Sequence, residues 1–230
     1  MVKILDCTIR DGGHETNWGF SSEFVYNLIK DLNIKKINYI EIGYRNFYDR
    51  TGKGNFFYCT PELLKDFYHS KGDLQFGIMT DTSRFLIDDF KDANKDFCDF
   101  VRIATHPDRI SNTLNIAYEL KQRGYNIFIQ LMEIPNLNNE HYQILEAWTH
   151  KNILESLYIA DTYSMIKPEN MKNYFEKLHS AGYENISFHA HNKSGLALIN
   201  TLEAIKLGAN IIDVSQNGLG GNLDISELIN

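Results

Sequence analysis

Two histidines two residues apart, His189 and His191, are the strongest candidates for chemistry in this sequence. They belong to an apolar run, 186–192, that is typical of a strand, and residues i and i+2 of a strand point to the same face about 6.6 Å apart. At that spacing both imidazoles can reach one metal ion at roughly 2.1 Å. A lone inward histidine is more often a hydrogen-bonded core residue, so spacing alone leaves that alternative open.

The segment 8–14, Thr-Ile-Arg-Asp-Gly-Gly-His, contains the other groups that a reaction needs. Asp11 could supply a carboxylate to the two histidines, and such a set suits Mn²⁺, Mg²⁺, Fe²⁺, Co²⁺ or Zn²⁺. Arg10 offers a fixed positive charge for a developing oxyanion. His14 can act as a base near neutral pH. The alternative is an Arg-Asp pair that caps a turn, with His14 as a loop residue.

Further polar residues lie where predicted strands end. The loop 45–55 carries Arg45, Arg50 and Lys53 beside two glycines, so we interpret it as a clamp for a substrate anion, against the alternative of a solvated loop. His106 and Tyr163 are candidates for the inner surface or rim of a site, as is Arg102.

The elements that must position these residues alternate from one end of the chain to the other. Short apolar runs predict eight strands, and stretches with helical spacing of apolar residues separate them. The predicted strands are 3–9, 38–44, 75–80, 100–106, 127–133, 156–161, 186–192 and 211–215. Ser21, Ser22 and Thr60-Pro61 are typical helix starts.

We therefore expect an α/β fold, a single (β/α)8 TIM barrel over residues 1–230. On the first predicted strand Asp6, Thr8 and Arg10 share a face, and the double glycine after it should allow a sharp turn. About two turns, 225–229, remain for the eighth helix. We expect this helix to be truncated, and a second copy of the chain, in a homodimer, is a candidate to cover the gap.

Composition narrows the function. The formal net charge of −7 argues against nucleic acid and against an anionic membrane surface as partners. The three widely spaced cysteines suggest neither disulfides nor a thiolate metal site. We find no signal-like segment and no apolar run of about 18 residues. The expectation is a cytoplasmic protein.

Three ordered motifs resemble one known superfamily, the metal-dependent barrel lyases. They are the Thr-x-Arg-Asp-Gly element at 8–12, the His-x-His pair at 189–191 and Gly-Leu-Gly-Gly-Asn at 218–222. The superfamily contains hydroxymethylglutaryl-CoA lyase, isopropylmalate synthase and the pyruvate carboxyltransferase domain. The chain most resembles the catalytic domain of 4-hydroxy-2-oxovalerate aldolase.

The resemblance implies roles for particular residues. The metal would be bound by Asp11, His189 and His191, with Asn222 as a further ligand. Arg10 would steady an enolate oxygen, and His14 would be the base of a 4-hydroxy-2-oxo acid aldolase. Glu41 and Asp161 correspond to positions that line the site.

The reaction implied is cleavage of a 4-hydroxy-2-oxo acid to pyruvate and an aldehyde through a metal-stabilised enolate, with Mn²⁺ or Mg²⁺ favoured. A small 2-oxo acid is the expected partner. Two alternatives stay open: a Claisen-type synthase that joins an acyl-CoA to a 2-oxo acid, and a metal-binding barrel without activity.

Overall fold

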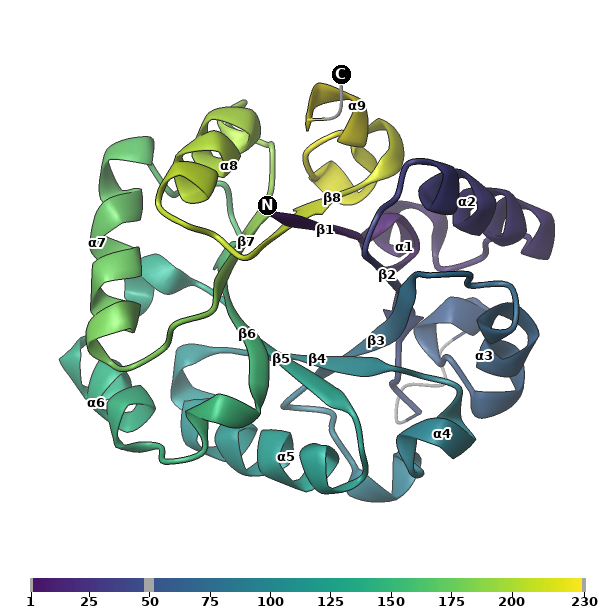
Figure 1. The fold of residues 1–230 in the computed structure, drawn as a ribbon, viewed down its shortest axis with the longest axis horizontal. Coiled ribbons are helices and arrows are strands. Elements are labelled where there is room, and N and C mark those ends of the chain that lie inside the picture. Colours follow the sequence, from purple (N-terminus) through teal and green to yellow (C-terminus); the bar gives the residue numbers. More distant parts are fainter. Residues whose placement is uncertain (1, 48–51, 229–230) are drawn as a thin grey trace.

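Eight parallel strands close into a barrel, with helices around it, in the computed structural model, which describes residues 2–47 and 52–228 (Figure 1). Each strand pairs with the next along the chain, and β1 also pairs with β8, which closes the sheet. The strands are β1 (Lys3–Asp6), β2 (Tyr39–Tyr44), β3 (Gln75–Asp81), β4 (Phe100–Thr105), β5 (Asn126–Leu131), β6 (Leu154–Asp161), β7 (Ile186–Ala190) and β8 (Ile211–Val214). The predicted TIM barrel is confirmed.

The helices cover the outside of the barrel. They are α1 (Thr8–Thr16), α2 (Ser22–Ile34), α3 (Pro61–Tyr68), α4 (Ala93–Asp96), α5 (Ile110–Gln122), α6 (Asn139–Ala147), α7 (Pro168–Ser180), α8 (Ala197–Lys206) and α9 (Ile225–Leu228). Short 3₁₀ turns are η1 (Asn55–Phe57), η2 (Ile87–Asp89), η3 (Pro107–Arg109), η4 (Ile134–Asn136), η5 (Lys151–Ile153) and η6 (Gln216–Gly221). The helix after β8 is described from Ile225 to Leu228, and Ile229, the end of its predicted range, lies outside the described residues.

Helix starts follow the signals in the sequence. The Ser21 hydroxyl accepts a hydrogen bond from the Phe24 N–H and begins α2, and Thr60 does the same for Leu63 at the start of α3. These side chains satisfy backbone donors that have no partner inside a helix. Local capping therefore sets where these two helices begin.

The hydrophobic core has two separate parts. A large cluster fills the layer between the strands and the helices. A small one lies inside the barrel and is built from Leu5, Cys7, Tyr39, Phe100, Phe128, Tyr158 and Ile211. Many of these residues come early in their strands, so they plug the amino end of the barrel. The polar inward residues are left at the carboxyl end, where this fold places its active sites.

The first strand is shorter than predicted. It ends at Asp6, whose carboxylate accepts hydrogen bonds from the Thr8 N–H (3.0 Å) and the Thr8 hydroxyl (2.7 Å). Such a local turn offers the backbone an alternative to the sheet, and α1 begins at once. The expectation that Thr8 and Arg10 lie on a strand is wrong, because both are helical.

The double glycine has a packing role in place of the predicted sharp turn. Gly12 and Gly13 lie inside α1. A Cβ at Gly13 would come within 2.0 Å of the Trp18 indole, and one at Gly12 within 3.1 Å of Leu219. The glycines therefore let Trp18 and the η6 segment approach the helix closely.

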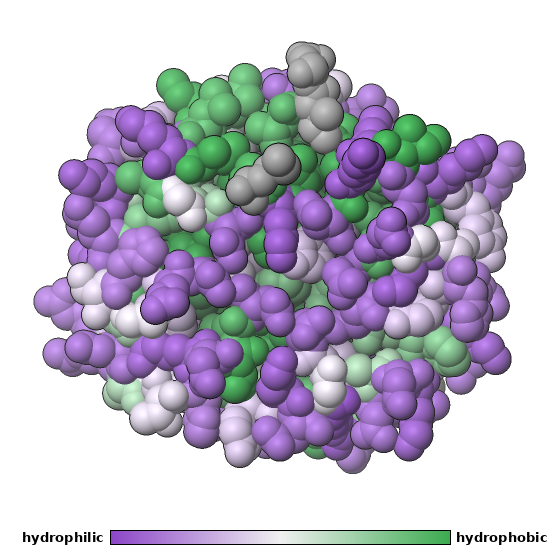
Figure 2. Space-filling view, viewed as in Figure 1, coloured by the Kyte–Doolittle hydropathy of each residue, from purple (hydrophilic) through white to green (hydrophobic). Residues whose placement is uncertain are grey.

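The surface seen in Figure 2 is mostly hydrophilic, with apolar side chains gathered around α8 at the upper left. On that helix Ile199 and Leu202 are each about half exposed. The homodimer expected from the sequence stays a prediction. Among the described residues, no helix combines the length and the hydrophobicity that crossing a membrane requires.

The aromatic plug leads to a test of stability. A Cβ at Gly77 would lie 2.3 Å from the Phe100 ring inside the barrel, so Gly77→Ala should lower the free energy of unfolding by about 1–3 kcal/mol. Gly19→Ala is the control, because its Cβ would meet nothing closer than 3.4 Å. Urea unfolding followed by circular dichroism measures both, and equal stabilities would contradict the packing described here.

Candidate active site

Three residues distant in sequence come together at the carboxyl end of the barrel. The His189 Nε2 atom lies 3.4 Å from Asp11 Oδ2, and the His191 Nε2 atom lies 3.9 Å from the same oxygen. The two histidines come from the end of β7 and the aspartate from α1, and their ligand atoms all lie within 4.8 Å of one another. The structure thus assembles one carboxylate and two imidazoles as a group that could hold a metal ion.

Two buried atoms in this cluster fit a cation. His189 Nε2 and Asn222 Oδ1 are buried and have no hydrogen-bond partner among the described residues. Asn222 is held beside the cluster by its amide, which donates to Asp11 Oδ2 at 2.8 Å. Unpartnered buried acceptors are costly, and a divalent ion would satisfy both. The residues therefore fit the metal that their chemistry implies.

Both imidazoles are in the form that binds metals. Burial lowers the pKa of His189 well below its usual value, and burial together with the neighbouring His189 lowers the pKa of His191 to about 3. Both are neutral at pH 7, as metal ligands must be. Cys7, which also lies near His189 and Asp213, is less suited, because burial raises the pKa of its thiol.

Asp213 orients the first histidine. Its Oδ2 atom lies 2.8 Å from His189 Nδ1, which places the proton of the imidazole on Nδ1 and leaves Nε2 free toward Asp11. Carboxylates commonly orient metal-binding histidines in this way. Asp213 lies on β8, and its partnership with His189 could be identified only from the fold.

Arg10 reaches the site from α1 and is held by a carboxylate. Its Nε donates to Glu41 Oε2 at 2.6 Å, and its Nη1 contacts Asp11 Oδ1. The third nitrogen, Nη2, is buried and has no hydrogen-bond partner among the residues described. Arg10 therefore keeps one directed donor for an anionic oxygen.

Glu41, which the resemblance places among the residues that line the site, binds two arginines. Both of its carboxylate oxygens accept hydrogen bonds from Arg102, and one also accepts from Arg10. It is fully buried, and its pKa is lowered: the two guanidiniums outweigh the opposing effect of burial. Its position makes it the carboxylate that binds both arginines.

His14 lies on the same face of α1 as Arg10 and Asp11, because residues three and four apart are neighbours on a helix. Its ring makes an edge contact with Trp18, with centroids 4.8 Å apart, and faces Tyr44 more distantly. Partial burial, then Arg10 and Lys53, lower the pKa of His14 to about 4. At neutral pH it is already unprotonated and can accept a proton.

Arg45 lies outside this cluster. It is buried, and its guanidinium binds Asp96 Oδ2 at 2.5 Å and the Cys59 carbonyl. This placement does not agree with the interpretation of Arg45 as an anion clamp. Of the other cations in that loop, Lys53 packs over the Trp18 ring, and Arg50 is outside the described residues.

The remaining predicted residues divide into two groups. Asp161 accepts hydrogen bonds from the Met165 and Ile166 N–H groups, so it shapes the loop after β6. His106 and Tyr163 both contact Glu133 Oε1, at 3.1 and 3.0 Å. They form a solvent-facing group on the loops after β4, β5 and β6. Glu133 was missed by the sequence analysis, and no motif marks it.

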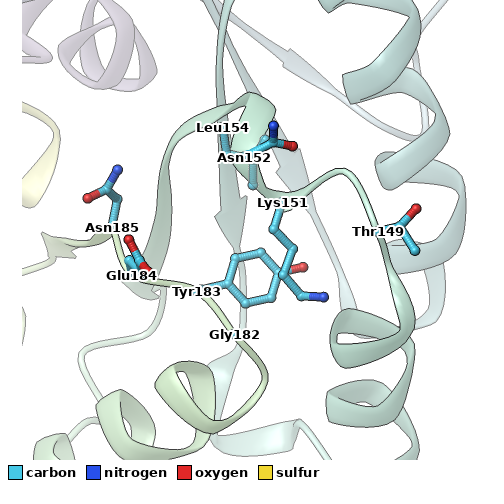
Figure 3. Close-up of a pocket in the computed structure, with 8 residues that line it drawn as sticks. All are labelled: Thr149, Lys151, Asn152, Leu154, Gly182, Tyr183, Glu184 and Asn185. Carbon is cyan, nitrogen blue, oxygen red and sulfur yellow. The ribbon is translucent and has the colours of Figure 1, made fainter.

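Hollows occur at both ends of the barrel. One of about 650 Å³ touches the candidate site and is lined partly by His191, Asn222 and Glu15. Figure 3 shows another, of about 450 Å³, beside the amino ends of β6 and β7, with Lys151, Tyr183 and Asn185 among its lining residues. None of the predicted site residues lines the second hollow, which therefore lies apart from the candidate site.

A closed parallel barrel with this group at its carboxyl end defines a TIM-barrel protein with a candidate metal centre. Residues 110–230 match the HMGL-like family. A solved structure, the N-terminal domain of a putative aldolase from Bacteroides vulgatus, superposes with a TM-score of 0.90 at 30% identity, over 99% of this chain and 78% of that one. The chain belongs to the HMGL-like family.

Two curated relatives are enzymes. The chain is 25% identical to an oxaloacetate decarboxylase from Mycobacterium tuberculosis and 27% identical to a 4-hydroxy-2-oxovalerate aldolase from Carboxydothermus hydrogenoformans. Each match covers 98% of this chain and 68% of the relative. The predicted resemblance to the metal-dependent barrel lyases is confirmed at the level of the family.

The environment of His14 can be tested by titration. NMR should show its imidazole titrating near pH 4, because partial burial and the cations of Arg10 and Lys53 all disfavour the protonated form. Lys53→Met should raise this pKa by removing one cation. A His14 pKa near 6.5, unchanged by Lys53→Met, would contradict the site described here.

Proposed function

We propose that this protein is a divalent-metal-dependent carbon–carbon lyase that cleaves a 4-hydroxy-2-oxo acid to pyruvate and an aldehyde. The observation that carries the proposal is the convergence of Asp11, His189 and His191, with Arg10 and His14 one helical turn apart on α1. The aldolase and decarboxylase relatives support it.

The protein groups provide each proton and charge that the cleavage needs. His14, unprotonated at neutral pH, takes the proton of the substrate 4-hydroxyl. The C3–C4 bond then breaks, the aldehyde forms at C4, and the electron pair passes to the pyruvate enolate. The unpaired Nη2 of Arg10 donates to the enolate oxygen. The proton taken up by His14 is returned to C3 of the enolate, which completes pyruvate.

The charge of the site favours a dication. Three carboxylates, Asp11, Glu41 and Asp213, face two guanidiniums, Arg10 and Arg102, in one contact network. With the three carboxylates ionised and the histidines neutral, this network carries one excess negative charge. A bound Mn²⁺ or Mg²⁺ would offset it and would supply a Lewis acid for the 2-oxo and carboxylate oxygens of the substrate.

We assign substrate selection to residues on the loops after β4, β5 and β6, at the rim of the barrel. His106 and Tyr163, held by Glu133, are our candidates for contacts to the aldehyde portion of the substrate. Asp161 acts through the loop that it holds, and Arg45 is not included. We further propose that the protein acts in the cytoplasm and that residues 1–230 form one catalytic domain.

Decarboxylation of oxaloacetate is the second candidate. The Mycobacterium tuberculosis relative favours it. The reaction forms the same pyruvate enolate, because loss of CO₂ leaves its electron pair at C3. It needs Arg10 but no base for a hydroxyl, so His14 separates the two candidates.

The metal site is tested by removing its ligands. His189→Ala and His191→Ala should each weaken Mn²⁺ binding by more than the roughly 10- to 100-fold typical of an outer-shell partner, because each deletes a ligand nitrogen. Isothermal calorimetry with Mn²⁺ measures the change. His69→Ala, an exposed histidine elsewhere, should bind as the wild type does. Equal Mn²⁺ affinity in all four proteins would refute the site.

The base is tested by comparing two reactions. His14→Ala should slow carbon–carbon cleavage by about 10²–10⁴, the range for a positioned base, and leave oxaloacetate decarboxylation and Mn²⁺ affinity largely intact. Arg10→Lys should slow both reactions, because both form the enolate that Arg10 faces. Steady-state pyruvate release gives the rates. If His14→Ala slows both reactions equally, His14 is not the hydroxyl base.

A further inference from the structure

We propose that Arg102 is a positioning residue that sets the enolate-facing nitrogen of Arg10 and the metal-facing nitrogen of His189 at the same time. The inference rests on the proposed metal-dependent lyase and adds a residue that touches neither substrate nor ion. Arg102 lies on β4 and is fully buried inside the barrel.

One side of the Arg102 guanidinium sets the orientation of Arg10 through Glu41. Arg102 Nε donates to Glu41 Oε1 at 2.8 Å, and Nη2 contacts Oε2. The same Oε2 accepts from Arg10 Nε at 2.6 Å. With Nε and Nη1 of Arg10 both occupied, Nη2 is the nitrogen left for the enolate oxygen. The orientation of Arg10 therefore depends on where Arg102 holds the carboxylate.

The other side controls His189 through Asp213. Arg102 Nη1 lies 2.5 Å from Asp213 Oδ2, and that same oxygen lies 2.8 Å from His189 Nδ1. Arg102 therefore places its positive charge on the same oxygen that accepts from His189 Nδ1. That acceptor keeps the proton of His189 on Nδ1 and its Nε2 free for the ion.

A guanidinium is needed for this double contact. Its planar fork presents donors in two directions, toward β2 and β8, whereas an ammonium is a point charge on a flexible stem. The group also lies 4.7 Å from the centroid of the Tyr158 ring, above the aromatic plug of the barrel. Buried ion pairs are weak contributors to stability because desolvation offsets their attraction. Function is then the stronger reason for this network.

The chain contains a matched control for the competing explanation, that Arg102 only supports the fold. Asp96 is fully buried, like Asp213, and accepts from Arg45 Nη1 at 2.5 Å, as Asp213 accepts from Arg102. The Arg45–Asp96 pair joins the end of β2 to α4 and touches none of the candidate site. Asp96→Asn thus reproduces the loss of a buried charge without the link to His189.

The experiment compares Arg102→Lys, Asp213→Asn and Asp96→Asn with the wild type. Mn²⁺ affinity by calorimetry is the first readout, and thermal unfolding confirms that each variant is folded. Arg102→Lys and Asp213→Asn should each weaken Mn²⁺ binding about 10- to 100-fold, as loss of an outer-shell partner does. Asp96→Asn should bind Mn²⁺ within about twofold of the wild type. The Arg102→Lys/Asp213→Asn double variant should lose less Mn²⁺ affinity than the product of the two single losses, because both substitutions act on His189.

A second readout requires no metal. In the metal-free wild type, ¹⁵N NMR should show His189 protonated on Nδ1 and unprotonated on Nε2. Arg102→Lys and Asp213→Asn should mix or reverse this tautomer, and Asp96→Asn should not. If Arg102→Lys does not fold, Asp213→Asn and Glu41→Gln replace it in the test. Glu41→Gln should lower turnover and leave the His189 tautomer unchanged.

The outcomes separate the two proposals. Folded Arg102→Lys with wild-type Mn²⁺ affinity and tautomer overturns the positioning role, as does an equal loss in Asp96→Asn. The expected binding and tautomer results without turnover of any oxo acid would support the positioning role and reject the proposed reaction. A wild type that binds no Mn²⁺ would overturn both.

Discussion

Charge compensation inside the barrel is the constraint on which the candidate site depends. Glu41 and Asp213 are fully buried, and an isolated buried carboxylate is strongly disfavoured. Arg102 contacts both, and Arg10 shares Glu41 with it. The guanidiniums leave Asp11 and two neutral histidines facing one another. Three carboxylates thus share two guanidiniums beside two neutral histidines, and a cation bound there would complete the charge balance.

The barrel makes this possible by separating its interior into two levels. Aromatic and aliphatic side chains fill the amino end, with Phe100 and Phe128 in edge contact at 5.1 Å between centroids. Two residues further along β4, Arg102 takes the next inward position. Strand alternation places successive inward residues on successive levels. The apolar side chains at the amino end therefore exclude water from that side of the barrel. This strengthens each electrostatic contact at the carboxyl end.

Two arginines show what the sequence could not distinguish. Arg45 and Arg102 both come from strands or strand ends, and each binds a buried aspartate. Arg45 follows β2 and points to the helical layer, where it joins Asp96. Arg102 points inward and meets residues of β2 and β8. A one-residue difference in strand register decides the face, and the bulge between Glu41 and Tyr44 shifts that register.

By itself the sequence determined the eight strands, most of the helices and the three motifs that resemble the barrel lyases, because periodicity and capping are local properties. It also placed Asp11, His189 and His191 in one group, since strand ends of a parallel barrel meet at one edge. Only the tertiary structure decided that β1 ends at Asp6 and α1 begins at Thr8, where a side-chain turn competes with the sheet. It alone showed that Glu41 and Asp213 meet through Arg102, because contacts across a barrel join residues from 61 to 111 positions apart.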